Sequence, residues 1–278
     1  MIQDRCFISV DIGGTKIGAG VFTFSGDALF RVEQVSSCGF IALSKNLVVL
    51  FQQLIAFIHS QELDVDSRIV MGSPGNFLED GTVYSGSISH LESYEGEFEG
   101  VNLVALFNQC VPDRYSVLVM NDAAIQLAGG LFLLNMVPEG KLVGYIGPGT
   151  GLGGAFAFFD QGRLNYVSDG HISTVLVPFE GTLYPAESLL SGSALKRLTG
   201  FDSKQINDSL DLQHQYRSVL ESFGVVLVDL IDVLIKGQPS FVSGVVPWSE
   251  EDCQQIKRCR TFLIGGGVGT RGFTSEVI

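Results

Sequence analysis

Three glycine-rich loops, each directly after an apolar run, constrain the fold of this 278-residue chain most strongly. They lie at residues 11–16 (DIGGTK), 149–154 (GTGLGG) and 265–269 (GGGVG). Consecutive glycines lack Cβ atoms, so their backbone N–H groups can converge on a phosphate. Each loop taken alone could instead be a tight hairpin turn that needs positive φ angles. Three such loops, two of them with threonine, favour phosphate binding.

The flanking sequence decides how such loops would hold a phosphate. Residues 149–154 match the dinucleotide fingerprint G-x-G-x-x-G, but that motif must open a helix. The apolar run at 155–159 that follows is typical of a strand, and no Walker A sequence occurs. We therefore expect hairpins, and not a P-loop, to hold the phosphates. A nicotinamide-binding oxidoreductase stays a distant alternative that rests on the glycine pattern alone.

Apolar periodicity predicts two halves that each contain a strand, a glycine turn and a strand. Helical spacing occurs over 43–61, 101–109, 123–135 and 212–235, the last as one continuous helix. Strands are predicted at 6–10, 17–24, 28–34, 68–72, 116–120, 142–146, 155–159 and 261–264. We predict an N-terminal domain over residues 1–120 and a C-terminal domain over residues 121–278.

Composition excludes several classes of protein. The net charge of −13 argues against nucleic acid and against anionic membrane surfaces as partners. A hydrophobic content of 46% is too high for a disordered chain. Five cysteines without CxxC spacing fit neither a disulfide scaffold nor a zinc ribbon. With no signal-peptide core and no apolar stretch of about 20 residues, we expect a cytoplasmic protein.

Three polar segments outside the glycine loops are candidates for chemistry. Asn121 and Asp122 stand where a predicted strand gives way to a helix. They could cap that helix, a contribution of about 0.5–2 kcal/mol. Asp122 could also be a general base that accepts a hydroxyl proton, and both roles are compatible if Asn121 caps. His171 is either a packed or surface residue or a ligand, and Glu187 could be a carboxylate favoured by a helix N-terminus.

Taken in order, these segments resemble the ROK family of sugar kinases and the bacterial glucokinases. Residues 11–16 are similar to the family's first phosphate loop, 149–154 to its second and 265–269 to its adenosine loop. The resemblance implies a nucleotide site at Gly13, Gly14, Thr15, Lys16, Gly149, Thr150, Gly151, Gly266 and Gly267. It also implies that Asp11 orients Mg²⁺ through water.

The sugar-binding segments of that family have counterparts as well. The turn at 72–75 (GSPG) resembles the family's G-x-P-G turn, and Asn121-Asp122-Ala123 resembles its N-D-A segment. The resemblance implies Asp122 as the catalytic base. It implies that Gly75, Asn121, His171 and Glu187 bind the sugar.

The resemblance implies a two-lobed α/β fold of the ribonuclease-H-like, actin/hexokinase type with an interlobe cleft. The implied reaction is ATP-dependent phosphorylation of a hexose, with glucose at its C6 hydroxyl favoured, as in glycolysis. ATP and Mg²⁺ are the expected cofactors. Sugar and nucleotide are the expected partners, and a homodimer is one candidate assembly.

Two departures from the family pattern bear on this expectation. Ser168 stands where the family has a sugar-contacting glutamate, although Asp169 is adjacent. The cysteine-rich loop that holds zinc in many members is replaced by residues 173–184, so we predict no structural zinc. The alternative function is a non-catalytic sugar- or nucleotide-binding sensor of the same fold.

Overall fold

The chain forms two compact units, Met1–Asp122 (unit 1) and Ala123–Ile278 (unit 2). These units differ from the predicted domains only at Asn121 and Asp122, which belong to the first unit and not to the second. The structure is a computed structural model and describes residues 5–12, 16–23, 27–35, 40–75, 77, 80–83, 101–109, 114–136, 139–169, 171–243 and 248–266.

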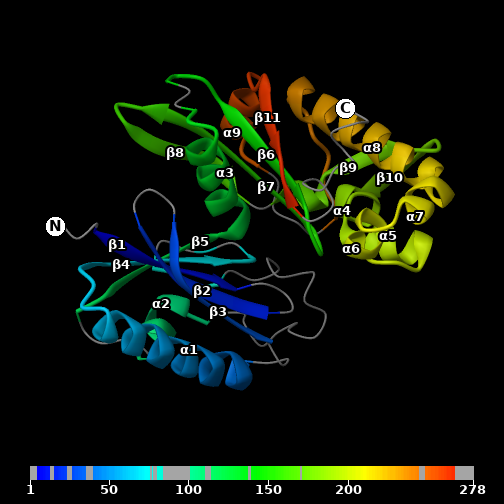
Figure 1. The fold of residues 1–278 in the computed structure, drawn as a ribbon. Helices are drawn as coiled ribbons and strands as arrows, with labels where there is room; N and C mark the ends of the chain where they lie inside the picture. Colours follow the sequence, from blue (N-terminus) through cyan, green and yellow to red (C-terminus); the bar gives the residue numbers. More distant parts are fainter. Residues whose placement is uncertain are drawn as a thin grey trace. The chain divides into compact units, whose positions relative to one another are not determined.

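Unit 1 is built on a five-stranded sheet with the order β3-β2-β1-β4-β5 (Figure 1). The first three strands form an antiparallel meander, and β4 and β5 run parallel to β1. The strands are β1 (Cys6–Ile12), β2 (Lys16–Thr23), β3 (Ala28–Val35), β4 (Val65–Ser73) and β5 (Ser116–Asn121). Two helices accompany them, α1 (Phe40–Ser60) and α2 (Leu103–Asn108).

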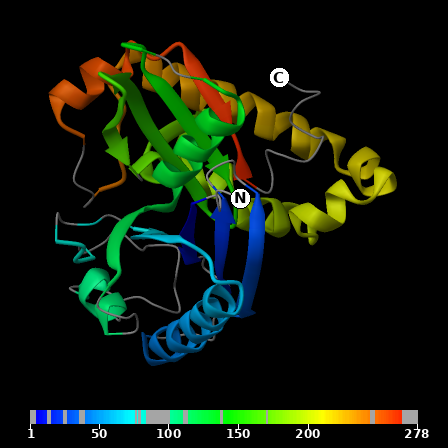
Figure 2. The ribbon, with the colours of Figure 1, turned by 60° about the vertical axis from the view of Figure 1, so that its left-hand side comes forward.

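The core of unit 1 lies between the sheet and α1, which runs along one face of the sheet (Figures 1 and 2). Alternate residues of β1 point into this core, as strand geometry requires. The fully buried residues include Ile8, Val10, Ile17, Val21, Leu47, Leu50, Phe51 and Leu54. Because β1, β4 and β5 are parallel, their carboxyl ends lie at one edge of the sheet.

Unit 2 repeats this plan with a four-stranded sheet of order β11-β6-β7-β8. Here β6, β7 and β8 are the antiparallel meander, and β11 runs parallel to β6. The sheet strands are β6 (Val143–Pro148), β7 (Leu152–Asp160), β8 (Arg163–Asp169) and β11 (Thr261–Ile264), and β9 (Leu176–Phe179) and β10 (Thr182–Pro185) form a separate hairpin.

Helices supply the rest of unit 2. They are α3 (Asp122–Leu133), α4 (Ala186–Leu189), α5 (Gly192–Thr199), α6 (Ser203–Asn207), α7 (Leu210–Gln215), α8 (Arg217–Lys236) and α9 (Glu250–Ile256), and a 3₁₀ turn spans His171–Thr174. Within the part of the chain that the structure describes, no helix has the length and apolar character needed to cross a membrane.

The two faces of the unit 2 sheet are covered by different helices (Figure 2). Ile146 and Phe156 belong to the core that includes α8. Tyr145 alternates to the other face, where its hydroxyl hydrogen-bonds Gln126 of α3. The sheet is therefore enclosed on both sides, as its apolar strands require.

Two predicted elements of unit 2 are wrong in extent. The predicted gap between the strands at 142–146 and 155–159 is shorter, because β6 runs to Pro148 and β7 starts at Leu152. Gly154 lies in β7, where a Cβ would meet the Ile172 side chain at 2.3 Å, so the close packing of this strand position needs a glycine. The predicted continuous helix 212–235 is two helices, α7 and α8, which divide at Tyr216. The Tyr216 ring packs against Phe201 at this break, with ring centroids 6.0 Å apart.

Candidate functional site

Polar residues gather at the carboxyl edge of the unit 1 sheet. Asp11 pairs with Gly72 across β1 and β4, and Ser73 pairs with Asn121 across β4 and β5. This register brings residues from three parallel strands to one edge. Carboxyl edges of parallel strands are where open α/β sheets bind ligands. The exposed Asp11 and the turn after β4 therefore lie at the edge where such sheets place their ligands.

A hydrogen bond joins two of the residues predicted to bind the sugar, Asn121 and Gly75. Asn121 is only 4% exposed, and its Nδ2 donates a hydrogen bond of 2.8 Å to the carbonyl oxygen of Gly75. Gly75 has a φ of 111°, a backbone conformation that L side chains rarely adopt. The amide of Asn121 thus fixes the turn that follows β4.

Asp122 is the first residue of α3 and is half-buried. The positive end of the helix dipole favours its negative charge. The first turn of α3 is anchored to β8, because the Tyr166 hydroxyl donates a 3.0 Å hydrogen bond to the Ala124 carbonyl oxygen. Asp122 is therefore a carboxylate on a fixed helix start, next in sequence to the buried Asn121.

The loop between β6 and β7 is held through its carbonyl groups by the start of α5. The Gly192 N–H donates to the Gly149 oxygen at 2.7 Å. The Thr150 oxygen accepts two bonds from Ser193, at 2.8 Å from Oγ and 3.2 Å from the backbone N–H. A Cβ on Gly192 would lie 2.7 Å from the Gly149 oxygen, so only glycine permits this approach.

These bonds fix the direction of the loop's N–H groups. In a trans peptide the C=O of one residue and the N–H of the next point in opposite directions. Since the oxygens of Gly149 and Thr150 face α5, the N–H groups of Thr150 and Gly151 point away from it. Neither N–H has a hydrogen-bond partner among the described residues. Two adjacent N–H groups directed the same way can receive an anion.

Glu187 lies at the base of the same loop. Its Oε2 accepts a hydrogen bond of 3.2 Å from the backbone N–H of Leu152, the first residue of β7. Sequence reasoning placed Glu187 among the sugar-binding residues. The structure shows it beside the second phosphate loop, and its predicted contact with the sugar stays a prediction.

The glycines after β11 are closely packed against β6. Gly266 has a φ of 74°, and a Cβ there would lie 2.3 Å from the Pro148 oxygen. The Tyr145 hydroxyl occupies the space that Cβ atoms on Gly147 and Gly265 would need, at 2.5 and 2.4 Å. The strand end that carries the 149–151 loop and the strand end that carries Gly266 are thus packed together.

Several of the predicted site residues are not among those that the structure describes. Gly13, Gly14 and Thr15 of the first loop and Gly267 of the third are not among the described residues, and neither are the side chains of Lys16 and His171. Their predicted roles stay predictions. Among the described residues, no three His, Cys, Asp or Glu side chains group as metal ligands.

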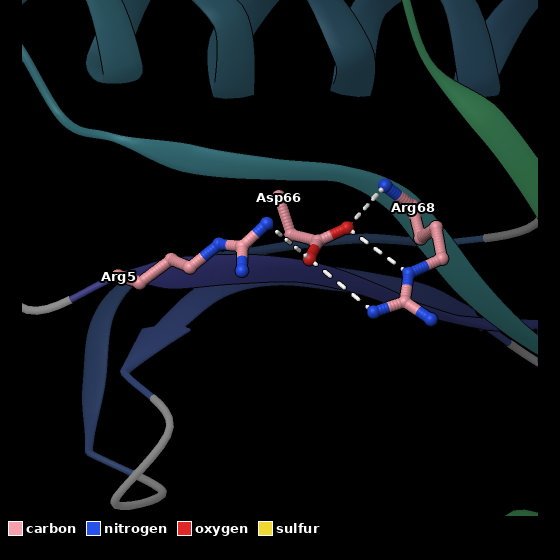
Figure 3. Close-up of polar contacts among 3 residues, drawn as sticks. All are labelled: Arg5, Asp66 and Arg68. Carbon is pink, nitrogen blue, oxygen red and sulfur yellow. Dashed lines mark hydrogen bonds and ion pairs between the residues drawn. The ribbon is translucent and has the colours of Figure 1, made fainter.

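The opposite edge of the unit 1 sheet carries an ion-pair cluster (Figure 3). Asp66 is 5% exposed, and its carboxylate lies 3.1 Å from an Arg5 nitrogen and 3.2 Å from Nε of Arg68. Hydrogen bonds from the Arg68 side chain and backbone N–H hold the pKa of Asp66 below its usual range. This cluster joins the amino ends of β1 and β4, away from Asp11.

Sequence reasoning did not predict that Gly192 and Ser193 orient the 149–151 loop. Ser191-Gly192-Ser193 carries a helix-start signal, and the Ser191 hydroxyl accepts the Ala194 N–H at 3.0 Å. That signal predicts where α5 begins. It does not show that the first N–H groups of α5 bond to a loop more than forty residues earlier.

Comparisons with known proteins agree on the fold. No protein-family model and no curated protein matches the chain. A ROK family glucokinase from Streptomyces griseus, solved with glucose and AMPPNP, matches with a TM-score of 0.64 at 20% identity. The match covers 95% of this chain and 83% of that one. The chain has the fold of the ROK-family sugar kinases. The predicted fold class, α/β of actin/hexokinase type, is confirmed.

Two further structures show the range of proteins with this fold. An inorganic polyphosphate/ATP-glucomannokinase from Arthrobacter sp. strain KM matches at 20% identity with a TM-score of 0.57, covering 98% of both chains. A ROK family transcriptional regulator, a homologue of the E. coli MLC protein, matches at 14% identity with a TM-score of 0.63, covering 95% of this chain and 74% of that one. Kinases and regulators thus share the architecture, so function must be argued from the site.

Proposed function

We propose that this protein is a sugar kinase of the ROK type, which transfers the γ-phosphoryl group of ATP to a hexose hydroxyl. The observation that carries the proposal is the 149–151 loop, whose N–H groups at Thr150 and Gly151 are turned outward by bonds on its carbonyl side. The fold supports it, and so does the ordered series of segments that resemble those of the ROK family.

The unit 1 edge would bind the sugar and carry the acid–base chemistry. Asp122 would accept the proton of the attacking hydroxyl as that oxygen bonds to the γ-phosphorus and ADP leaves. Asn121 and the turn at Gly75, already bonded to each other, would hold the sugar hydroxyls. His171 and Glu187 would contribute further hydrogen bonds to the sugar. Glucose at its C6 hydroxyl is the proposed acceptor.

The glycine loops would bind the nucleotide. The N–H groups of Thr150 and Gly151 would donate to phosphate oxygens, and Gly13, Gly14, Thr15 and Lys16 would do so from the first loop. Gly266 and Gly267 would contact the adenosine. Positioning and charge stabilisation are most of what phosphoryl transfer asks of a protein.

Mg²⁺ fits the residues at the unit 1 edge. This ion keeps several waters and takes only one or two protein carboxylates besides phosphate oxygens. The exposed carboxylate of Asp11 at this edge suits such a site. Asp11 would hold the ion through water, and the ion would neutralise charge on the phosphates.

The direct test is ADP release from Mg-ATP across a panel of hexoses and N-acetylhexosamines. We expect ADP release that depends on one sugar, with glucose giving the highest kcat/KM. Inorganic polyphosphate, run as an alternative donor, would show whether ATP is the phosphoryl donor. With polyphosphate the product measured is sugar phosphate, and absence of both sugar-dependent ADP release from ATP and sugar phosphate formation from polyphosphate would contradict the kinase proposal.

A non-catalytic sugar sensor is the second candidate. Two observations favour it, namely Ser168 at the position of the family's glutamate and the match to a transcriptional regulator of the same fold. A thermal-shift screen separates the candidates, because a ligand that binds only the folded state raises Tm. A sugar that raises Tm without any ADP release would support the sensor. A cytoplasmic location, a homodimer and the lack of structural zinc stay predictions.

A further inference from the structure

The start of α5 and the 149–151 loop form a chain of aligned peptide groups. The N–H groups of Gly192 and Ser193 are the first two of α5 and have no carbonyl partner within the helix. They donate to the oxygens of Gly149 and Thr150 instead, at 2.7 and 3.2 Å. Each of these peptides then directs its own N–H, on Thr150 and Gly151, away from the helix.

Through these hydrogen bonds, the positive N-terminal end of the α5 dipole polarises the peptide groups of the loop. A helix N-terminus favours an anion through its unpaired N–H groups. Here those groups are occupied by the loop carbonyls, and the polarised loop peptides present their own N–H groups in their place. An anion at Thr150 and Gly151 would therefore interact with α5 through the intervening peptides.

The Ser193 hydroxyl fixes the orientation of the Thr150–Gly151 peptide. Its 2.8 Å bond to the Thr150 oxygen is shorter than the 3.2 Å bond from the Ser193 N–H to the same atom. Without Oγ, the Thr150–Gly151 peptide would retain only the longer bond. Two further bonds hold the loop, from the Gly149 N–H to the Gly151 oxygen at 2.8 Å and from the Leu152 N–H to Glu187 at 3.2 Å. Neither of them is made to the Thr150 oxygen.

We propose that Ser193 is a positioning residue for the nucleotide phosphates, which orients the Thr150–Gly151 peptide so that α5 acts on the phosphate through it. The inference rests on the proposed nucleotide-binding role of the loop. It names a residue that touches neither sugar nor adenosine in the proposed function.

The test is calorimetric binding of ADP, adenosine and glucose to the wild type, Ser193→Ala and Ser193→Thr. Loss of one hydrogen bond of this kind should weaken ADP binding by roughly 3- to 10-fold in Ser193→Ala. Adenosine and glucose should bind unchanged, because neither places a phosphate on the loop. Threonine keeps the hydroxyl and should restore ADP affinity. In turnover assays, the KM for ATP should rise while the KM for the sugar stays the same.

Ser60→Ala is the matched control. The exposed Ser60 also donates from Oγ to a carbonyl oxygen at 2.8 Å, that of Phe57 in α1. Its removal should leave ADP affinity unchanged. Unchanged ADP affinity in Ser193→Ala, or an equal loss of adenosine affinity, would overturn the inference. A wild type that binds no ADP would overturn the proposed function itself and the inference with it.

Discussion

The two units use one sheet plan but present different chemical groups at the carboxyl edge. In unit 1 the ends of β1, β4 and β5 carry Asp11, the turn at Gly75 and Asn121. In unit 2 the ends of β6 and β11 carry glycines, including Gly149 and Gly266. Among the described residues, the unit 1 edge offers side chains and the unit 2 edge offers backbone groups.

Similar sheets can therefore serve different ligands. Side-chain carboxylates and amides can distinguish sugar hydroxyls and move protons, whereas a bare backbone can approach a phosphate closely. The support also differs. Asn121 fixes its edge by a side-chain bond to Gly75, and the 149–151 loop is fixed by bonds to its main-chain oxygens. Function at the unit 1 edge should therefore be lost when a side chain is removed. Ligand binding at the unit 2 edge should be lost when a Cβ is added to a glycine.

The largest effect is expected from Asp122→Asn. Removal of a general base lowers turnover by about 10²–10⁴-fold. The amide keeps the size of the carboxylate, so the variant should fold and bind sugar. We would measure kcat for ADP release together with Tm. A loss of less than tenfold in a folded variant would show that Asp122 acts as a helix residue only.

The next effect is expected from Gly192→Ala. The added Cβ would lie 2.7 Å from the Gly149 oxygen, a backbone atom that cannot move without shifting the loop. We expect a loss of ADP affinity of at least about tenfold, because the hydrogen bond from the Gly192 N–H to that oxygen is lost. Gly129→Ala is the control, because its Cβ meets no atom within 4 Å in α3 and should stabilise by about 0.5–1 kcal/mol. Equal ADP affinity in both variants would refute the backbone account of unit 2.

Asn121→Ala tests the side-chain account of unit 1 through stability. The substitution leaves the Gly75 oxygen without its 2.8 Å bond from Nδ2 at a buried position. Loss of that partner should lower the free energy of unfolding by about 1–3 kcal/mol. Urea unfolding at constant m-value measures this change. A free energy of unfolding equal to that of the wild type would mean that Asn121 does not hold the turn.

The smallest effect concerns the opposite edge of unit 1, at Asp66. Its pKa lies below the unfolded value, so the ion pairs with Arg5 and Arg68 stabilise the fold above that value. This contribution is lost as pH falls through the lowered pKa. Asp66→Asn should therefore lower Tm at pH 7 and differ less from the wild type near pH 3.

Asp232→Asn serves as the reference for Asp66, since Asp232 forms an exposed i,i+4 ion pair with Lys236. Such exposed pairs contribute little to stability. A pH-independent Tm difference between Asp66→Asn and the wild type would contradict the ion-pair explanation.

Local patterns in the sequence predicted most of the strands and the polar edge of unit 1. Strand β11 (Thr261–Ile264) was predicted with its observed bounds, and the turn after β4 was predicted from Ser73-Pro74-Gly75. Asn121 was selected because a polar pair stood between a strand and a helix. These predictions succeed because turn chemistry and apolar alternation act over a few residues.

Contacts between distant segments could not be predicted in the same way. Apolar spacing continues across Tyr216, so the division between α7 and α8 has no sequence signal; it coincides with the packing of Tyr216 on Phe201. The bonds from Ser193 to Thr150 and from Leu152 to Glu187 depend on how α4 and α5 fold back on β6 and β7. Such tertiary contacts are set by packing of whole elements and not by local propensity.

The most direct test of the two-edge account is calorimetric binding of sugar and ADP to Asn121→Ala and Gly192→Ala, both checked for folding. We predict a crossed result. Asn121→Ala should lose sugar affinity and keep ADP affinity, and Gly192→Ala should lose ADP affinity and keep sugar affinity. Loss of both ligands in each variant, or of neither, would contradict the assignment of side-chain chemistry to unit 1 and backbone recognition to unit 2.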